Sequence, residues 1–178
     1  TVAMNATGSR WCAAEVGSDV AQSDAGLVHV FNSTCTQPAA YCTAQTNSLG
    51  CMPQIDSHGT PSASKSGGFR ITTSNTRNQR TGILFYGTSD PLAQPWSGGT
   101  LCVQPPLRRT AVQSSGGNPT PANDCSGAFD LDFNSWRAAS LDPALFAGQH
   151  VFAQYLSRDP SPASQTNLTD AVEFYLEP

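Results

Sequence analysis

Basic residues are scarce in this 178-residue chain, which contains Lys65 as its only lysine and carries a formal net charge of -4. Charged residues of both signs make up only 12% of the sequence. A protein that binds nucleic acid needs a basic footprint, so we expect no nucleic-acid partner. No run of about 18 apolar residues occurs, and we therefore expect no membrane-spanning helix.

The chain also lacks the usual marks of a complete, newly synthesised protein. It begins Thr1-Val2-Ala3-Met4, without an initiator methionine and without the basic segment that opens a signal peptide. We expect it to be a mature or excised piece of a larger precursor.

Six cysteines are present, and they indicate where the protein resides. Pairs of cysteines persist as disulfides in oxidising compartments, which predicts an extracellular or cell-surface location. No Cys-x-x-Cys motif occurs, and none of the three histidines lies at a zinc-finger spacing from a cysteine. Six cysteines allow 15 pairings, and proximity in the sequence favours Cys12–Cys35, Cys42–Cys51 and Cys102–Cys125.

Strand signals are frequent, whereas helix signals are limited to the short stretches 134–140 and 142–147. Alternating or continuous apolar runs, bounded by Gly, Pro, Ser and Asn, are typical of β-strands. They occur at Gly26–Phe31, Gly68–Thr73, Gly82–Tyr86, Thr100–Val103, Ala128–Phe133, Gln149–Leu156 and Ala171–Leu176.

This spacing predicts an all-β fold, an antiparallel β-sandwich of jelly-roll or immunoglobulin-like Greek-key type reinforced by disulfides. The composition changes near residue 36, where the segment Thr36–Tyr41 contains a proline. We expect an N-terminal segment, residues 1–36, with one strand and a disulfide, followed by the sandwich domain, residues 37–178. A single strand cannot stand alone, so Gly26–Phe31 must join a sheet elsewhere.

Residues 41–178 resemble a C-terminal domain of large secreted planctomycete proteins. The stretches that carry the resemblance are Tyr41–Ile55, Gly59–Ser64, Gly82–Asp90, Gly98–Val103, Asp124–Asn134 and Leu168–Phe174. The resemblance implies a module of unestablished activity that usually follows β-propeller or integrin-like repeats, and Asp24–Phe31 is similar to the closing strand of such a repeat. It also implies a bacterial source.

The alternating stretch Ala128–Phe133 carries the strongest candidates for metal binding. Asp130, Asp132 and the following Asn134 offer the oxygen ligands that calcium prefers, although an exposed polar strand face has the same pattern. We expect no obligatory cofactor, with calcium at these three residues as the alternative.

Two aromatic residues are candidates for ligand binding. Trp96 is expected in a loop, Gln94–Gly99, that presents it to solvent, and Tyr175 is predicted to point outward from the last strand. Exposed aromatic rings can stack against sugars, which makes polysaccharide a candidate ligand.

These observations predict a non-catalytic secreted module for cell-surface or extracellular assembly or anchoring, whose partners are other copies of the chain or other surface proteins. Gly26–Phe31 is a candidate for donation to the open sheet edge of a neighbour. A carbohydrate-binding module is the first alternative. A secreted hydrolase that uses His58 or the Asp130/Asp132 pair is the second, although Asp56-Ser57-His58 are adjacent and cannot form a catalytic triad by themselves.

Overall fold

The computed structural model describes residues 2–4, 11–13, 38–160 and 165–178. The chain divides into two units, Thr1–Thr36 and Gln37–Pro178, which are described separately below. In the first unit, β1 (Val2–Met4) pairs antiparallel with β2 (Trp11–Ala13). The predicted strand Gly26–Phe31 and the predicted bridge to Cys35 lie outside the described residues.

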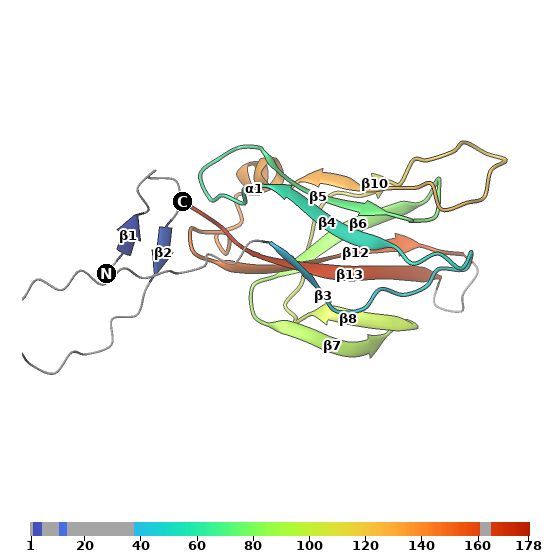
Figure 1. Ribbon diagram of the computed structural model, residues 1–178, viewed down its shortest axis with the longest axis horizontal. Coiled ribbons are helices and arrows are strands. Elements are labelled where there is room, and N and C mark those ends of the chain that lie inside the picture. The colour runs from blue at the N-terminus through green and yellow to red at the C-terminus, as the bar shows by residue number, and fades with distance from the viewer. Residues whose placement is uncertain (1, 5–10, 14–37, 161–164) are drawn as a thin grey trace, which may run out of the picture. The chain divides into compact units, whose positions relative to one another are not determined.

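A large antiparallel sheet forms the middle layer of the second unit (Figure 1). Its order is β10-β6-β12-β13-β3, with β9 also paired to β6. The strands are β3 (Ala39–Tyr41), β6 (Thr81–Gly87), β9 (Arg108–Arg109), β10 (Gln113–Ser114), β12 (His150–Arg158) and β13 (Thr166–Tyr175). The apolar run predicted to be a central strand is β6, which has partners on both sides.

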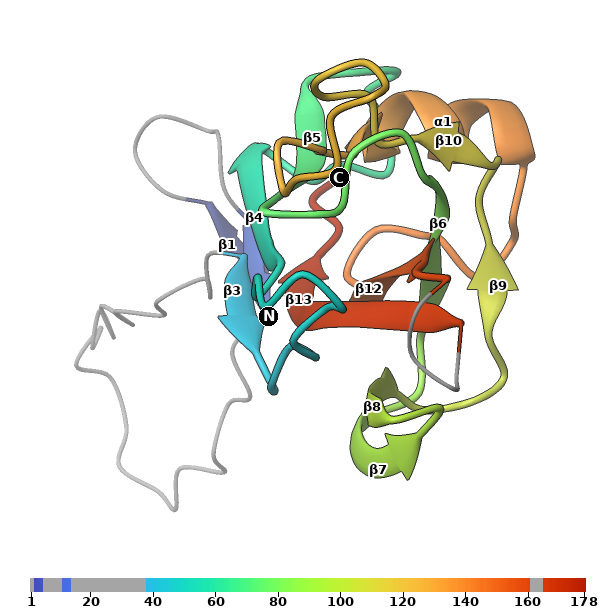
Figure 2. The ribbon, with the colours of Figure 1, turned by 90° about the vertical axis from the view of Figure 1, so that its right-hand side faces the viewer.

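A smaller sheet covers one face of the large sheet (Figure 2). It consists of β11 (Asp130–Asp132), β5 (Phe69–Ser74) and β4 (Gln54–Gly59), in that order. The alternation of each strand places its apolar residues inside, so that Phe69 and Ile71 pack against Phe174 and other buried residues of the large sheet. The main core lies between the two sheets, as a β-sandwich requires.

A β-hairpin covers part of the opposite face of the large sheet. It is formed by β7 (Pro91–Trp96) and β8 (Gly99–Val103). Ser97 and Gly98 connect the strands, with φ angles of 53° and 82°. Two successive positive φ angles are typical of a type I′ turn, whose twist matches that of the flanking strands, and glycine tolerates such a conformation without strain. Trp96 therefore ends a strand and is not part of a loop.

One helix is present among the described residues, α1 (Phe133–Ser140). Asp132 caps it, because its Oδ1 accepts a hydrogen bond from the backbone NH of Ser135 at 3.0 Å. The predicted strand Ala128–Phe133 is correspondingly shorter and gives way to the helix at Phe133. The second predicted helical stretch, 142–147, forms a turn that is held by the Leu145 NH bonded to the Asp142 carbonyl.

Two disulfides cross-link the second unit, and they correct the pairing predicted from sequence proximity. Cys42 is bonded to Cys102, and Cys51 is bonded to Cys125. The predicted pairs Cys42–Cys51 and Cys102–Cys125 are wrong. Strand pairing brings distant segments together, so the nearest cysteine in space is not the nearest one in the sequence.

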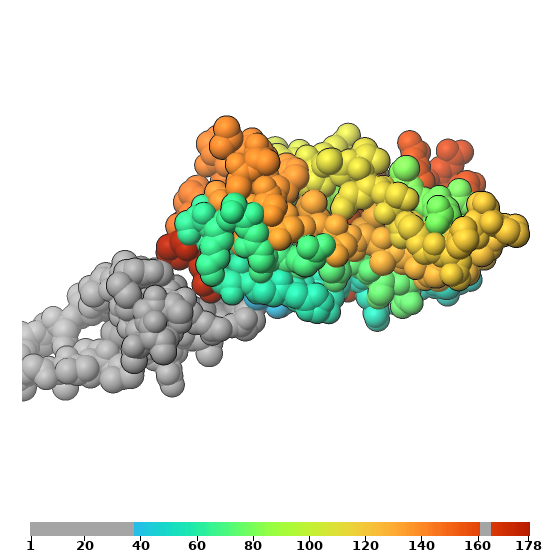
Figure 3. All heavy atoms as spheres, turned by 90° about the horizontal axis from the view of Figure 1, so that it is seen from above, coloured from blue at the N-terminus to red at the C-terminus, as the bar shows by residue number. Residues whose placement is uncertain are grey.

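The prediction of an all-β, antiparallel sandwich with disulfides is confirmed for the second unit. Within the described residues, no helix has the length and apolar character needed to cross a membrane. Figure 3 shows the surface over the small sheet, with α1 in orange at one end and the loop around residues 116–123 in yellow at the other. The hairpin face of the large sheet carries the candidate site.

Candidate binding site on the outer face of the large sheet

The face of the large sheet that points away from the small sheet is only partly covered. Under the β7–β8 hairpin, Phe85, Val103, Phe152 and Leu168 form a second apolar cluster. The hairpin covers the middle of the face and leaves each end of the sheet open. The two open ends carry different side chains.

The hairpin is held firmly on the sheet by Gln154 of β12, whose side chain is fully buried. Its Oε1 accepts a hydrogen bond from the Cys102 NH at 3.0 Å. Its Nε2 donates to the Thr169 carbonyl at 2.7 Å and to the Thr100 carbonyl at 3.0 Å. Together with the Cys42–Cys102 disulfide, this satisfied buried amide ties the hairpin to the strands beneath it.

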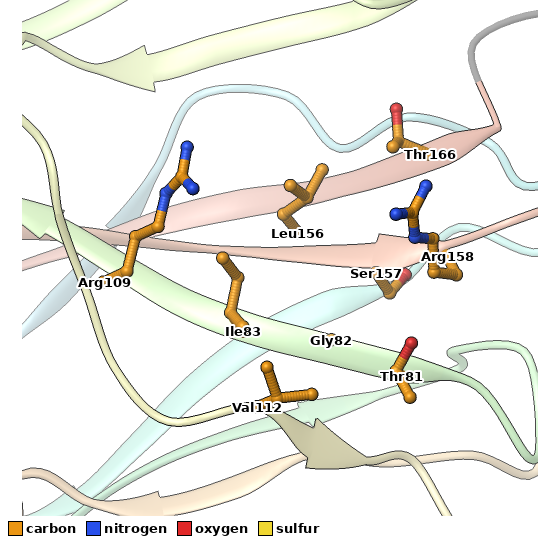
Figure 4. A pocket seen from close by; sticks show the side chains of 9 residues that line it. All are labelled: Thr81, Gly82, Ile83, Arg109, Val112, Leu156, Ser157, Arg158 and Thr166. Carbon is orange, nitrogen blue, oxygen red and sulfur yellow. The ribbon is translucent and has the colours of Figure 1, made fainter.

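A hollow of about 340 Å³ lies at one open end, beside the hairpin (Figure 4). The hollow opens to solvent, and residues of β6, β9, β12, β13 and the segment that joins β9 to β10 surround it. We call it the basic hollow. Its lining consists of Thr81, Gly82, Ile83, Arg109, Val112, Leu156, Ser157, Arg158 and Thr166.

The lining of the basic hollow combines an apolar surface with polar groups. Ile83 and Leu156 are opposite each other on β6 and β12, and the exposed Val112 adjoins them. Hydroxyl groups come from Thr81, Ser157 and Thr166. Apolar lining with a few convergent polar groups is the usual character of a ligand site, so this hollow is the best candidate for binding.

Two arginines, Arg109 and Arg158, give the hollow its charge. Both are exposed, and their guanidinium groups lie on the same side of the sheet in Figure 4. Within residues 38–160 and 165–178, neither is joined to a carboxylate by an ion pair of 4 Å or less. These two cations are therefore available to an anionic ligand.

Trp96 adjoins the same end of the sheet. The hydroxyl of the next residue, Ser97, is hydrogen-bonded at 2.8 Å to the hydroxyl of Thr166, which lines the hollow. The Trp96 side chain is 44% exposed. The prediction that Trp96 is presented to solvent agrees with this exposure, and the Ser97–Thr166 contact places it near the hollow.

Tyr175, the other predicted ligand residue, is also 44% exposed but lies at the far end of β13. The ten residues from Thr166 to Tyr175 span about 30 Å of strand. Tyr175 and Trp96 therefore belong to different surfaces and do not flank one small ligand. The Tyr175 ring stacks on His150, with ring centroids 4.0 Å apart.

His150 occupies the second open end of the face, next to Glu173. Its Nε2 lies 3.1 Å from Glu173 Oε2, and its ring also contacts Phe152. Burial lowers the pKa of His150, and this effect outweighs the attraction of Glu173 and Asp90, which acts in the opposite direction. Burial therefore favours the neutral form of the imidazole.

The predicted calcium residues lie on the other side of the molecule, around the small sheet. Asp130 is paired with Arg70, and Asp132 caps α1 and also accepts a hydrogen bond from the Gly68 NH at 2.9 Å. Asn134 is fully buried, where its Oδ1 accepts from the Ser62 NH and its Nδ2 donates to the Thr60 and Gly67 carbonyls. Each of the three thus has protein partners, and calcium binding stays a prediction.

Burial would raise the pKa of Asp132, but the hydrogen bonds from the backbone NH groups of Ser135 and Gly68 outweigh it and lower that pKa. In the part of the chain that the structure describes, no three His, Cys, Asp or Glu side chains are grouped closely enough to hold a metal ion.

The residues considered for hydrolysis lie on the exposed face of the small sheet. His58 and Asp56 are two residues apart on β4, and His58 Nε2 lies 3.5 Å from Asp56 Oδ2. Both side chains are largely exposed. The structure thus brings His58 and Asp56 together, but it places them on a solvated strand surface and not in the hollow.

Sequence reasoning missed Arg109 and Arg158 as site residues. Arg108-Arg109 is the only adjacent basic pair in the chain, and this was the one available signal. The pair also divides between two environments, because Arg108 forms an ion pair with Asp142 at 2.8 Å while Arg109 lines the hollow. Comparisons of the chain with protein-family models, curated proteins and solved structures found no match.

Proposed function

We propose that this protein is a non-catalytic extracellular module that anchors to a polysaccharide, with the basic hollow as its binding site. The observation that carries the proposal is the open hollow, which lies beside the exposed Trp96 on a hairpin held rigidly by Gln154 and a disulfide. Binding surfaces on rigid elements hold their geometry without an ordering cost.

The two disulfides support the extracellular part of this proposal. Disulfides of this kind form and persist in oxidising compartments and are rare in the cytosol. Polysaccharides are abundant at cell surfaces, so an anchoring module in that location would have this ligand class within reach. The planctomycete resemblance, which implies a terminal module of a larger secreted protein, agrees with an anchoring role.

The test is a binding screen of the full chain against a panel of polysaccharides, followed by variants of the hollow. Trp96→Ala and Thr81→Trp should each weaken binding, the first by removing a stacking surface and the second by filling the rim. Phe146→Ala is the matched control, since it removes another exposed aromatic ring. Polysaccharide binding that is unchanged in both hollow variants would disprove this site.

Assembly through strand pairing is a second candidate, and one feature of the sheet edges favours it. β3 is an edge strand whose Ala39 and Ala40 are exposed and uncharged, so neither residue places a charged side chain against an incoming strand. By contrast, side-chain carboxylates bond two NH groups of the edge strand β4, those of Ile55 and Ser57. The predicted donor, Gly26–Phe31, lies outside the described residues.

Sedimentation velocity of the chain over a wide concentration range tests this candidate. Pairing at β3 predicts an oligomer that Ala40→Lys dissociates, because a lysine on an edge strand disfavours edge-to-edge contacts. Gln54→Lys on the edge strand β4 is the matched control. A monomer at every concentration would remove this candidate and leave the polysaccharide proposal untouched.

A further inference from the structure

We infer that the ligand of the basic hollow is an acidic polysaccharide, whose carboxylate or sulfate groups bind Arg109 and Arg158. This inference rests on the proposed function and adds the chemical class of the ligand. It starts from the lining of the hollow, which contains two arginines and no acidic residue.

The positive charge of the hollow is a local exception in an acidic protein. The chain carries a net charge of -4, and the arginines at positions 70, 77 and 108 each form an ion pair with an aspartate. Arg109 and Arg158 have no such pair within the described ranges 38–160 and 165–178. Arg80 and Arg137 also lack one there, but they do not line the hollow. Guanidinium groups bind carboxylates and sulfate-like oxyanions through forked hydrogen bonds, so an anionic ligand complements them.

The strand register fixes how far apart the two arginines are. Arg109 is opposite Phe85 on β6, and Arg158 follows Ser157, which is opposite Gly82. The positions of Arg109 and Arg158 in the sheet are therefore four residues apart along the strand direction, about 13 Å. Across the strands they are two strand spacings apart, about 10 Å. Their Cα atoms are consequently about 16 Å apart.

This separation indicates an extended ligand with more than one anionic group. A single small anion can bind to one of the two guanidinium groups. It can contact both groups only if the side chains of Arg109 and Arg158 bend towards each other. The apolar surface of Ile83 and Leu156 lies between the arginines and suits the C–H faces of sugar rings. The hydroxyl groups of Thr81 and Thr166 at the rim can bond sugar hydroxyls.

Acidic polysaccharide fits these features better than nucleic acid does. A nucleic acid carries a charge every few ångströms along each strand and requires a dense basic surface, whereas this protein is acidic overall. A polymer with more widely spaced anions needs only the two cations that the hollow offers. The exposed Trp96 next to the hollow adds a surface on which a sugar ring can stack.

Polygalacturonate and its methyl ester provide a matched pair of probes, because they share one backbone and differ in the charge of the carboxyl groups. The full chain should bind polygalacturonate and bind the methyl ester at least tenfold more weakly. Arg109→Gln and Arg158→Gln should each weaken polygalacturonate binding about tenfold, the typical effect of losing one charge-assisted hydrogen bond. The affinity should also fall as salt is added. It should fall less steeply in a variant that carries both Arg109→Gln and Arg158→Gln.

Lys65→Gln is the control for net charge, since Lys65 is an exposed cation that does not line the hollow. Near-ultraviolet circular dichroism verifies that each variant is folded. Equal affinity for the charged and esterified polymers, with sensitivity to Trp96→Ala only, would overturn the acidic ligand but keep the proposed function. Failure to bind any polysaccharide would overturn both.

A third result would reassign the ligand. An oligonucleotide or a poly-glutamate peptide that binds more tightly than polygalacturonate, with the same dependence on Arg109 and Arg158, would overturn the polysaccharide assignment. It would leave the hollow as a site for another polyanion.

Discussion

The guanidinium group of Arg77 lies against the carboxylate of Asp159, with Nη1 3.0 Å from Oδ1, and both side chains are almost completely buried. Ser48 completes the contact, because its NH donates to Asp159 Oδ2 and its hydroxyl accepts from Arg77 Nη1. Asp159 directly follows Arg158, so this ion pair also fixes the chain at one side of the basic hollow.

We therefore predict that Asp159→Asn destabilises the protein strongly. Removing one partner leaves a buried guanidinium group without its counter-charge, which typically costs about 3–5 kcal/mol. Urea unfolding followed by circular dichroism measures the effect. The control is Arg70→Gln, which breaks an ion pair on the exposed face of the small sheet and should leave the unfolding midpoint near that of the wild type. Equal effects of the two substitutions would contradict the prediction.

The pKa of His150 predicts how stability depends on pH. Its pKa is lowered in the folded protein, so in acid the unfolded chain takes up a proton more readily than the folded one. The contribution to stability is complete above the unfolded pKa of about 6.5 and is lost as the pH falls through the lower folded pKa. The facing charged and titratable groups are Glu173, Asp90 and Tyr175.

His150→Phe should abolish this loss of stability at low pH, since phenylalanine can occupy the place between Phe152 and Tyr175 without titrating. The measurement is the free energy of unfolding at a series of pH values between about 7 and 5, together with the NMR titration of the imidazole. His58→Gln, which replaces an exposed histidine on β4, should keep the loss of stability. A His150 that titrates at or above pH 6.5 would refute this account.

Asp132 distinguishes a helix cap from a calcium ligand. Replacement of the α1 cap Asp132 by alanine should cost about 1 kcal/mol. Asp132→Asn should cost less, because asparagine keeps an oxygen that accepts from the Ser135 NH but lacks the second acceptor that the Gly68 NH uses. A calcium ligand would behave differently, since the loss of a carboxylate charge lowers the affinity of a site for calcium. Thermal unfolding of the three proteins, each with calcium and with a chelator, separates the two roles. A calcium-dependent gain that Asp132→Asn abolishes would establish the metal site.

The sequence indicated the core of the sandwich well, because burial on one face leaves a direct pattern. In β13, Val172 and Phe174 are buried while Tyr175 is exposed, as the alternation predicts. The missed strands lack this pattern. β7 contains Pro91 and Pro95, which are tolerated only because it is an edge strand, and most of β4 is polar.

The candidate site was less predictable, for a physical reason. An exposed Trp96 follows from its polar and turn-rich surroundings, and the structure agrees. Arg109 and Arg158 belong to distant segments, however, and only the registers of β9 and β12 on β6 bring them to one face. Long-range register is set by packing across the whole sheet, and local sequence patterns do not reveal it.

The corrected disulfide pairing leads to the last prediction. Non-reducing peptide mapping of the protein should find Cys42 linked to Cys102 and Cys51 linked to Cys125. The double variant Cys42→Ser/Cys102→Ser should lose about 4 kcal/mol of unfolding free energy. The bridge that it removes joins cysteines 60 residues apart and therefore restricts the unfolded chain strongly. It should also weaken polysaccharide binding, since the hairpin that carries Trp96 loses its covalent link.

The matched control is Cys51→Ser/Cys125→Ser, whose cysteines are 74 residues apart and which should lose a similar free energy of unfolding. This control removes a bridge that does not involve the hairpin, so its polysaccharide affinity under folding conditions should stay close to that of the wild type. Equal losses of affinity in the two double variants would show that the Cys42–Cys102 bridge has no specific part in holding the site together.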